Sequence, residues 1–169
     1  MDAMDAIFSR RSIRQYASKK VPLEVVEELL KAAMCAPSAG NERPWHFVVI
    51  TERAILDEIP KFHPYAAMLK QARVAIVVCG DPALEKHKGY WVLDCAAATE
   101  NLLLAITARG LGAVWTGVYP TGDRVENLRK LLNLPQNIVP FSLIPLGYPA
   151  EEKPRTDRFD KSRVHHNGW

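Results

Sequence analysis

An apolar segment in the second half of the chain restricts the possible folds more than any other feature. Residues 90–109 include "VLDCAAATENLLLAITA", which predicts the longest helix of the chain, apolar on most of its faces. Such a helix has no broad polar face for water, so it must be buried, either within one chain or between two chains. Gly110 and Gly112 are expected to end this helix. The fold must therefore be organised around it.

Short apolar segments predict a sheet beside this helix. The expected strands are 45–51, 73–80, 113–118 and 141–149, each a short run bounded by turn residues. Helices are expected at 3–10, 22–34 and 123–132, with helical pieces in 52–72 that Pro60 and Pro64 interrupt. The predicted fold class is α/β, of the α+β type, with one sheet of about four strands in a single domain that covers residues 1–169.

Composition excludes several functional classes. The net charge of +3 is too weak for a protein built to hold duplex nucleic acid. No uninterrupted apolar run reaches about 18 residues, so no membrane span is expected, and the start "MDAMDAIFSRR" lacks the pattern of a signal peptide. Three cysteines without a C-x-x-C pair fit a reducing cytoplasm and predict no metal site. We therefore expect a cytoplasmic protein with no nucleic-acid or membrane partner.

The last 21 residues differ from the rest of the chain. The stretch "PAEEKPRTDRFDKSRVHHNGW" is polar and charged, with Phe159, Val164 and Trp169 as its large apolar residues. A segment of this composition cannot form a core of its own. It is either disordered or laid over another surface.

A basic segment stands near the start of the chain. "FSRRSIRQYASKKV", residues 8–21, contains Arg10, Arg11 and Arg14 around Ser12. In an extended backbone, residues 10, 12 and 14 point to the same side, and the guanidinium group offers a rigid fork of donors that suits phosphate. On these residues alone, a solvated basic face and a phosphate clamp are both open.

The chain lacks the usual signatures of side-chain catalysis. There is no G-x-S-x-G elbow and no G-x-x-x-x-G-K-[ST] phosphate loop. Gly110 and Gly112 end a helix and open a strand, which is the reverse of the order in dinucleotide-binding folds. No residue is therefore assigned as catalytic. If the protein is an enzyme, a bound cofactor carries the chemistry.

Four stretches together resemble the FMN-dependent nitroreductase family, whose members include NAD(P)H nitroreductases and flavin reductase-like proteins. They are "RRSIRQY", "APSAGNERPWHFVVI", "AAATENLLLAITARGLGAVWTGV" and "IPLGYPAEEKPRTDRFD". The resemblance covers residues 5–56 and 91–160, whereas 57–90 match poorly. It implies a mixed central sheet flanked by helices and an intertwined homodimer. It also implies that residues 150–169 form a C-terminal strap that wraps the partner, and that FMN binds in clefts between the subunits.

The resemblance also implies roles for particular residues. Those that would hold the FMN phosphate, ribityl chain or ring edge are Arg10, Ser12, Arg14, Lys153 and Arg155, with main-chain contacts from Arg11. Pro37, Ser38, Ala39 and Asn41 would come from the other subunit and pack beside the isoalloxazine. Thr116 and Gly117 would present a backbone N–H to flavin N5.

The activity that the resemblance implies is oxidoreduction. Two electrons would pass from NAD(P)H through FMN to a nitroaromatic, quinone or similar acceptor by a ping-pong mechanism. The alternatives are a dehalogenase or flavin-destructase relative, and an FMN-binding sensor or storage protein without turnover. The sequence differs from the family pattern at two places that affect substrate choice. The connection from Gly80 to Tyr90 is short, and Pro64–Ala67 lack a lysine and an asparagine that some relatives place near the flavin.

Overall fold

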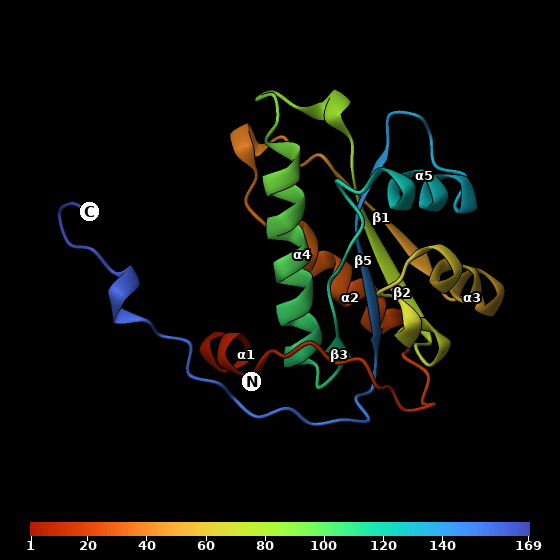
Figure 1. The fold of residues 1–169 in the computed structure, drawn as a ribbon, viewed down its shortest axis with the longest axis horizontal. Coiled ribbons are helices and arrows are strands. Elements are labelled where there is room, and N and C mark those ends of the chain that lie inside the picture. Colours follow the sequence, from red (N-terminus) through yellow and green to blue (C-terminus); the bar gives the residue numbers. More distant parts are fainter.

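The computed structural model describes residues 1–169 and contains one antiparallel sheet of five strands (Figure 1). The strands are β1 (Trp45–Ile50), β2 (Val74–Gly80), β3 (Gly112–Ala113), β4 (Thr116–Gly117) and β5 (Val139–Gly147). Their order is β1-β2-β5-β3, and β4 also pairs with β5. An isolated parallel bridge joins Ser12 to Ala113 at the β3 edge. The predicted α+β class is confirmed.

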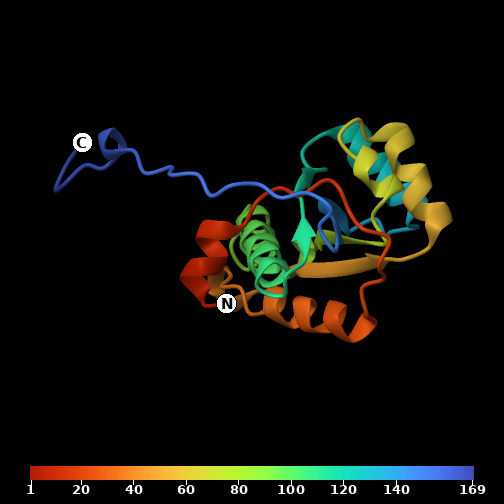
Figure 2. The same cartoon turned by 90° about the horizontal axis from the view of Figure 1, so that it is seen from below.

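Helices cover both faces of the sheet (Figure 2). The α-helices are α1 (Ala3–Ser9), α2 (Leu23–Met34), α3 (Arg53–Phe62), α4 (Trp91–Ala108) and α5 (Gly122–Leu131). Short 3₁₀ turns are η1 (Ala39–Asn41), η2 (Ala67–Lys70), η3 (Pro82–Leu84) and η4 (Lys161–Arg163). Helices α2 and α4 share one core cluster with the sheet, and α3, η2 and α5 share the other.

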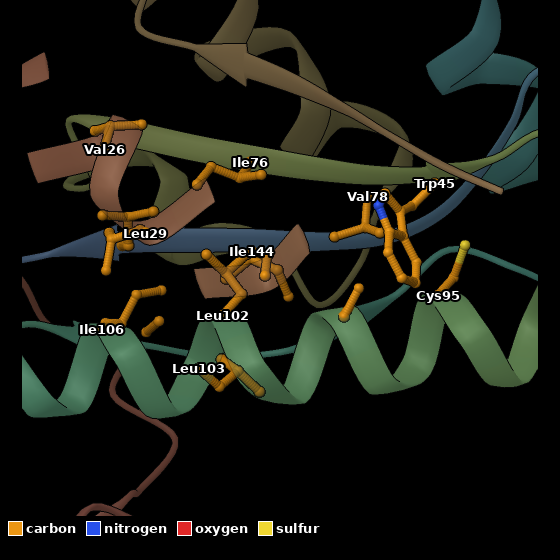
Figure 3. Packing of buried hydrophobic residues seen from close by; sticks show 14 of the residues in the cluster. Val26, Leu29, Trp45, Ile76, Val78, Cys95, Leu102, Leu103, Ile106 and Ile144 are labelled. Atoms are coloured by element: carbon orange, nitrogen blue, oxygen red, sulfur yellow. The ribbon is translucent and has the colours of Figure 1, made fainter. Parts of the chain in front are cut away.

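Strand β2 shows why the sequence specifies this arrangement. Ile76 and Val78 pack into the cluster under α2 and α4, while Ala75 and Val77 pack into the opposite cluster. Successive side chains alternate between the faces of a strand, and because both faces are covered, an unbroken apolar run is required. Figure 3 shows Ile76 and Val78 facing side chains of α4 such as Leu102.

The predicted strand 113–118 is divided in the structure, so the sheet has five strands and not four. Residues Gly112–Ala113 and Thr116–Gly117 pair with β5, and Pro145 of β5 lies beyond Ala113, whose partner is Leu146. Pro145 has no backbone N–H to donate, and the amide of Val114 reaches its carbonyl at 3.4 Å. The ladder is therefore weakened at this point, where the pairing is interrupted.

The predicted interruption at Pro60 is wrong, because α3 runs through this residue. Pro60 lies two residues before the end of the helix. Because proline has no backbone N–H, the helix lacks one hydrogen bond, the one to the carbonyl of Leu56. The helix ends at Phe62 instead, just before the His63–Pro64 pair.

Helix α4 is long and apolar enough to cross a membrane when length and composition alone are considered, which the sequence reading did not foresee. The face that carries Cys95, Ala98, Leu102 and Ile106 is fully buried against the sheet and α2. Core helices of soluble proteins meet the same criterion. In this fold α4 is the central core helix that its composition predicts.

Candidate cofactor site

The basic segment near the N-terminus is extended and attached to the sheet edge. Ser12 bridges to Ala113, the amide of Ile13 donates to the carbonyl of Ala113 at 2.9 Å, and Tyr16 bridges to Pro149. The side chain of Ile13 is buried, whereas that of Arg14 is exposed. This alternation fixes the segment as the sequence predicts, with its apolar side chains inward and its polar side chains outward.

The beginning of the C-terminal strap lies on this basic segment. Lys153 Nζ donates to the main-chain oxygen of Ser12 at 2.6 Å, and Arg11 Nε donates to the main-chain oxygen of Pro154 at 2.8 Å. The Glu151 carboxylate accepts from the amide of Arg14, and this bond lowers the pKa of Glu151. Two segments about 140 residues apart therefore form one surface.

This surface carries an excess of positive charge. We call Arg10, Arg11, Arg14, Lys153 and Arg155 the basic cluster. Three of its members have an acidic partner: Arg10 with Glu100 at 3.4 Å, Lys153 with Glu151 at 3.5 Å and Arg155 with Asp5 at 3.0 Å. Arg11 and Arg14 form no ion pair, and Arg11 Nη2 is buried without a hydrogen-bond partner. Such a donor set suits a phosphate monoester, which brings about two negative charges.

Two hollows adjoin the basic cluster. One, of about 480 Å³, is lined by Ile7, Phe8, Arg10, Arg11, Glu100 and residues 156–159. The other, of about 370 Å³, is lined by Arg14, Pro64, Tyr65, Ala67, Met68, Trp115, Thr116 and Gly117. We call the second hollow the ring pocket. It brings Arg14 beside Thr116 and Gly117, as a site for a phosphorylated ring compound requires.

The ring pocket contains residues that the sequence reading did not assign. Pro64 and Tyr65, which follow α3, and Trp115, which lies between β3 and β4, are among its lining residues. Buried His63 lies behind them, with Nε2 at 3.0 Å from the carbonyl oxygen of Gly117. The only signal in the sequence is a lone histidine directly before Pro64, and no motif marks it.

The remaining predicted site residues lie elsewhere in the same chain. Pro37, Ser38, Ala39 and Asn41 form the loop around η1, which lies at the N-terminal end of α4 (Figure 1). The amide of Ala39 donates to Asp94 at 2.9 Å, whereas Arg10 pairs with Glu100. Six residues along a helix correspond to about 9 Å of rise and about 120° of rotation between the two contact points. One chain alone therefore does not bring this loop to the basic cluster.

A pair of buried carboxyl groups holds the η1 loop in place. Glu42 Oε2 accepts from the amides of Lys86 and His87, at 2.7 and 3.1 Å. Burial raises the pKa of Asp94 most, and the Glu42 carboxylate raises it further, against the lowering effect of the Ala39 amide. Burial opposes ionisation of Glu42, but the two amides and Asp94 together lower its pKa. Glu42 Oε1 and Asp94 Oδ2 are buried without a hydrogen-bond partner, and the raised pKa makes Asp94 the member of the pair that holds a proton more readily than an ordinary aspartate.

Large apolar side chains are exposed on α1, at the end of α2 and at the start of α4. Met4, Ile7, Phe8, Met34 and Leu93 are all exposed in the single chain. A neighbouring hollow of about 440 Å³, between α1, α2 and α4, is mostly apolar. Continuous apolar surface of this kind is typical of protein–protein interfaces.

Comparison with known proteins gives the family. The sequence model of the Nitroreductase family matches residues 7–67 and 60–148, which together cover most of the chain. The protein is a member of the nitroreductase family. Over its whole length it is 55% identical to a protein from Methanothermobacter thermautotrophicus, provisionally named NADH dehydrogenase/NAD(P)H nitroreductase, and it covers 88% of that relative.

Two further relatives show the range of the nitroreductase family. An FMN-dependent nitroreductase from Clostridium difficile R20291 superposes with a TM-score of 0.91 at 28% identity, and 98% of this chain and 99% of that chain are covered. An iodotyrosine deiodinase from Haliscomenobacter hydrossis is 31% identical, with 92% of this chain and 83% of the relative covered. The resemblance and the fold predicted from sequence are confirmed, and the chain is a nitroreductase-family oxidoreductase.

Proposed function

We propose that this protein is a cytoplasmic, homodimeric FMN-dependent oxidoreductase. It passes two electrons from NAD(P)H to a nitroaromatic, quinone or similar acceptor. The observation that carries the proposal is the ring pocket, in which Arg14 lies beside Thr116 and Gly117 while the rest of the basic cluster continues from Arg14. The FMN-dependent relative with the same fold supports the choice of cofactor.

Each residue of the site has a defined role under this proposal. Arg10, Lys153 and Arg155 hold the phosphate, and Arg14 and Ser12 hold the ribityl chain and ring edge. Arg11 fixes the strap through Pro154. Thr116 and Gly117 offer the backbone N–H at flavin N5. When bound, FMN supplies hydride acceptance and electron delivery, and the chain supplies the electrostatic environment.

The division of the site supports the proposed homodimer. The η1 loop and the basic cluster are separated in one chain, and exposed apolar surface lies around α1 and α4. A second copy would cover this surface and bring its own Pro37, Ser38, Ala39 and Asn41 to the basic cluster. This arrangement gives two equivalent sites in each dimer.

Open access to the ring pocket supports one site that donor and acceptor use in turn. The connection from β2 to α4 spans residues 81–90 and contains only the short turn η3. A connection of this length can cover little of the ring pocket, so several unrelated acceptors should be able to enter it and react. Initial-rate plots at several acceptor concentrations should give parallel lines, whereas intersecting lines would show that donor and acceptor bind together.

Flavin titration tests the proposal directly. The purified protein, dialysed free of flavin, should bind about one FMN per chain, and anaerobic addition of NADH or NADPH should then bleach the visible flavin band. Absence of FMN binding would refute the proposal. Binding without bleaching would favour the sensor or storage alternative, and turnover confined to halogenated phenols would favour a dehalogenase, the activity named in the deiodinase relative.

A further inference from the structure

The two walls of the ring pocket come from distant parts of the chain. Pro64, Tyr65, Ala67 and Met68 follow α3, whereas Trp115, Thr116 and Gly117 belong to the β3–β4 segment. Strand β4 is only two residues long and pairs only with β5. Its position against the opposite wall therefore depends on contacts outside the ladder.

His63 provides such a contact. Its side chain is 1% exposed, and its Nε2 lies 3.0 Å from the carbonyl oxygen of Gly117, 54 residues away. Its Nδ1 accepts from the amide of Tyr65 at 3.3 Å. Because Nδ1 accepts, Nε2 carries the proton and donates to Gly117. One ring thus joins the main chains of both walls.

Arg124 of α5 donates to the same oxygen. Its Nη1 lies 3.0 Å from the carbonyl oxygen of Gly117, and its guanidinium lies 5.2 Å from the centre of the Tyr65 ring. Two donors on one carbonyl restrict the orientation of the peptide that follows Gly117. Burial lowers the pKa of His63 most, and the charge of Arg124 lowers it further, against the effect of the Gly117 carbonyl. The imidazole is therefore neutral and keeps the tautomer described.

We propose that His63 is a positioning residue for the flavin ring: together with Arg124 it holds the Gly117 carbonyl, and so fixes the β4 main chain against the edge of the bound isoalloxazine. The inference rests on the proposed function, since it concerns FMN in the ring pocket. It assigns a role in cofactor binding to the region between residues 57 and 90, in which the sequence predicts no site residue. His63 itself touches neither cofactor nor substrate.

Two amide variants of His63 test this role. In His63→Gln the side-chain amide can occupy the place of Nε2 and donate to Gly117, whereas in His63→Asn the amide is one methylene too short. Both variants bury a polar amide, so if His63 had only a packing role, FMN binding would be weakened equally in the two variants. FMN dissociation constants and the visible absorption bands of bound FMN should be measured for both, with thermal unfolding of the flavin-free proteins as a check on folding.

The expected result separates the two variants. His63→Asn should raise the FMN dissociation constant about tenfold, the effect of one lost hydrogen bond, and shift the flavin bands, while His63→Gln should stay within about threefold of the wild type with unshifted bands. Arg124→Ala should weaken binding less than additively in combination with His63→Asn, since both act on one oxygen. If His63→Asn does not fold, Arg124→Ala alone should still shift the bands.

Two kinds of failure are distinguishable. If the wild-type protein binds no FMN, the proposed function and this inference fall together. If the wild type binds FMN but His63→Asn and Arg124→Ala leave both the dissociation constant and the bands unchanged, the positioning role is refuted while the proposed function stands. Equal losses in His63→Gln and His63→Asn would also refute it, because they would show a packing role only.

Discussion

Lys153 and Ser12 are 141 residues apart in sequence, yet the Lys153 ammonium donates a 2.6 Å hydrogen bond to the main-chain oxygen of Ser12. The contact brings the start of the C-terminal strap onto the segment that carries Arg10, Arg11 and Arg14. Glu151, two residues earlier, accepts from the amides of Arg14 and Gln15 on the same segment. The strap is therefore part of the candidate phosphate site, and the basic cluster exists only when both ends of the chain are in place.

Removing the Arg10 side chain should weaken FMN binding. Arg10→Ala should cost about 1.5–3 kcal/mol of binding free energy, the range for a hydrogen bond to a charged group. Fluorescence titration with FMN measures the change. Lys61→Ala is a matched control, since Lys61 is also basic and ion-paired but lies on α3. An unchanged FMN affinity in Arg10→Ala would remove Arg10 from the site.

Cutting the chain after Pro149 should both loosen the dimer and release FMN. The cut removes Lys153 and Arg155 together with Phe159, Val164 and Trp169, which are exposed in the single chain. Each of these apolar side chains would contribute about 1.5–3 kcal/mol if a partner buries it, offset by the cost of ordering the strap. Size-exclusion chromatography read at protein and flavin wavelengths measures both effects.

A second truncation, after Arg158, separates the two functions of the strap. It keeps Lys153 and Arg155 but loses the three apolar residues. We expect it to weaken the dimer while FMN binding survives at high protein concentration. A chain ending at Pro149 that still elutes as a dimer with its full flavin content would show that the strap does neither.

The raised pKa of Asp94 should make stability depend on pH in a defined direction. The pKa of Asp94 is raised on folding from its ordinary value of 3.8, so its contribution is complete below that value and is lost as the pH rises through the folded pKa. In Asp94→Asn the side-chain amide replaces the protonated carboxyl and does not titrate. The variant should therefore gain stability relative to the wild type as the pH rises from about 4.

Urea denaturation of both proteins across this pH range checks the Asp94 prediction. Glu42, whose lowered pKa acts in the opposite direction, is present in both proteins and keeps the Lys86 and His87 amides that lower its pKa. The difference between the two proteins therefore reports on Asp94 together with its effect on Glu42. A difference that is constant, or that falls as the pH rises, would show that Asp94 is ionised in the native protein.

Gly80 should tolerate no side chain. A Cβ at this position of β2 would overlap the indole of Trp91, the first residue of α4. Gly80→Ala should therefore destabilise the protein by about 1–3 kcal/mol, as overpacking does in cores. Gly122→Ala in α5 is the control, since its Cβ would meet nothing within 4 Å and should stabilise by about 0.4–1 kcal/mol. Equal free energies of unfolding for Gly80→Ala and the wild type would contradict the packing described.

Much of the fold was predictable because local patterns and tertiary packing agree. The apolar spacing of residues 23–34 and the nearly all-apolar segment 91–108 gave helices α2 and α4 within a residue or two. The unbroken apolar run 74–80 gave the central strand, since both faces of β2 are covered. Where the local sequence is ambiguous, as in the division between β3 and β4, the outcome depends on Pro145 in a strand far along the chain.

The candidate site was predictable only in part. The arginines around Ser12 stand together in sequence, so their clustering was visible, and their extended backbone is confirmed. The approach of Lys153 was implied by the family resemblance and by no local pattern, because the chain closes this contact over 141 residues. The role of His63 could not be predicted, because it depends on the carbonyl oxygen of Gly117. Every residue carries such a backbone oxygen, and no sequence motif marks this one.

The most direct test of the central claim, that two chains build each FMN site, uses a heterodimer with one defect in each chain. One chain carries Arg10→Ala and Arg14→Ala; the other carries Ala39→Trp, which fills the space expected for the ring. Co-expression with two affinity tags isolates the heterodimer, and its FMN content is measured at an FMN concentration too low to fill either variant homodimer. If the sites are shared, one site combines the intact basic cluster of one chain with the intact η1 loop of the other. The account therefore predicts about one FMN per heterodimer and almost none in either variant homodimer. A heterodimer that binds no more FMN than the variant homodimers would show that each site belongs to a single chain and would contradict the account.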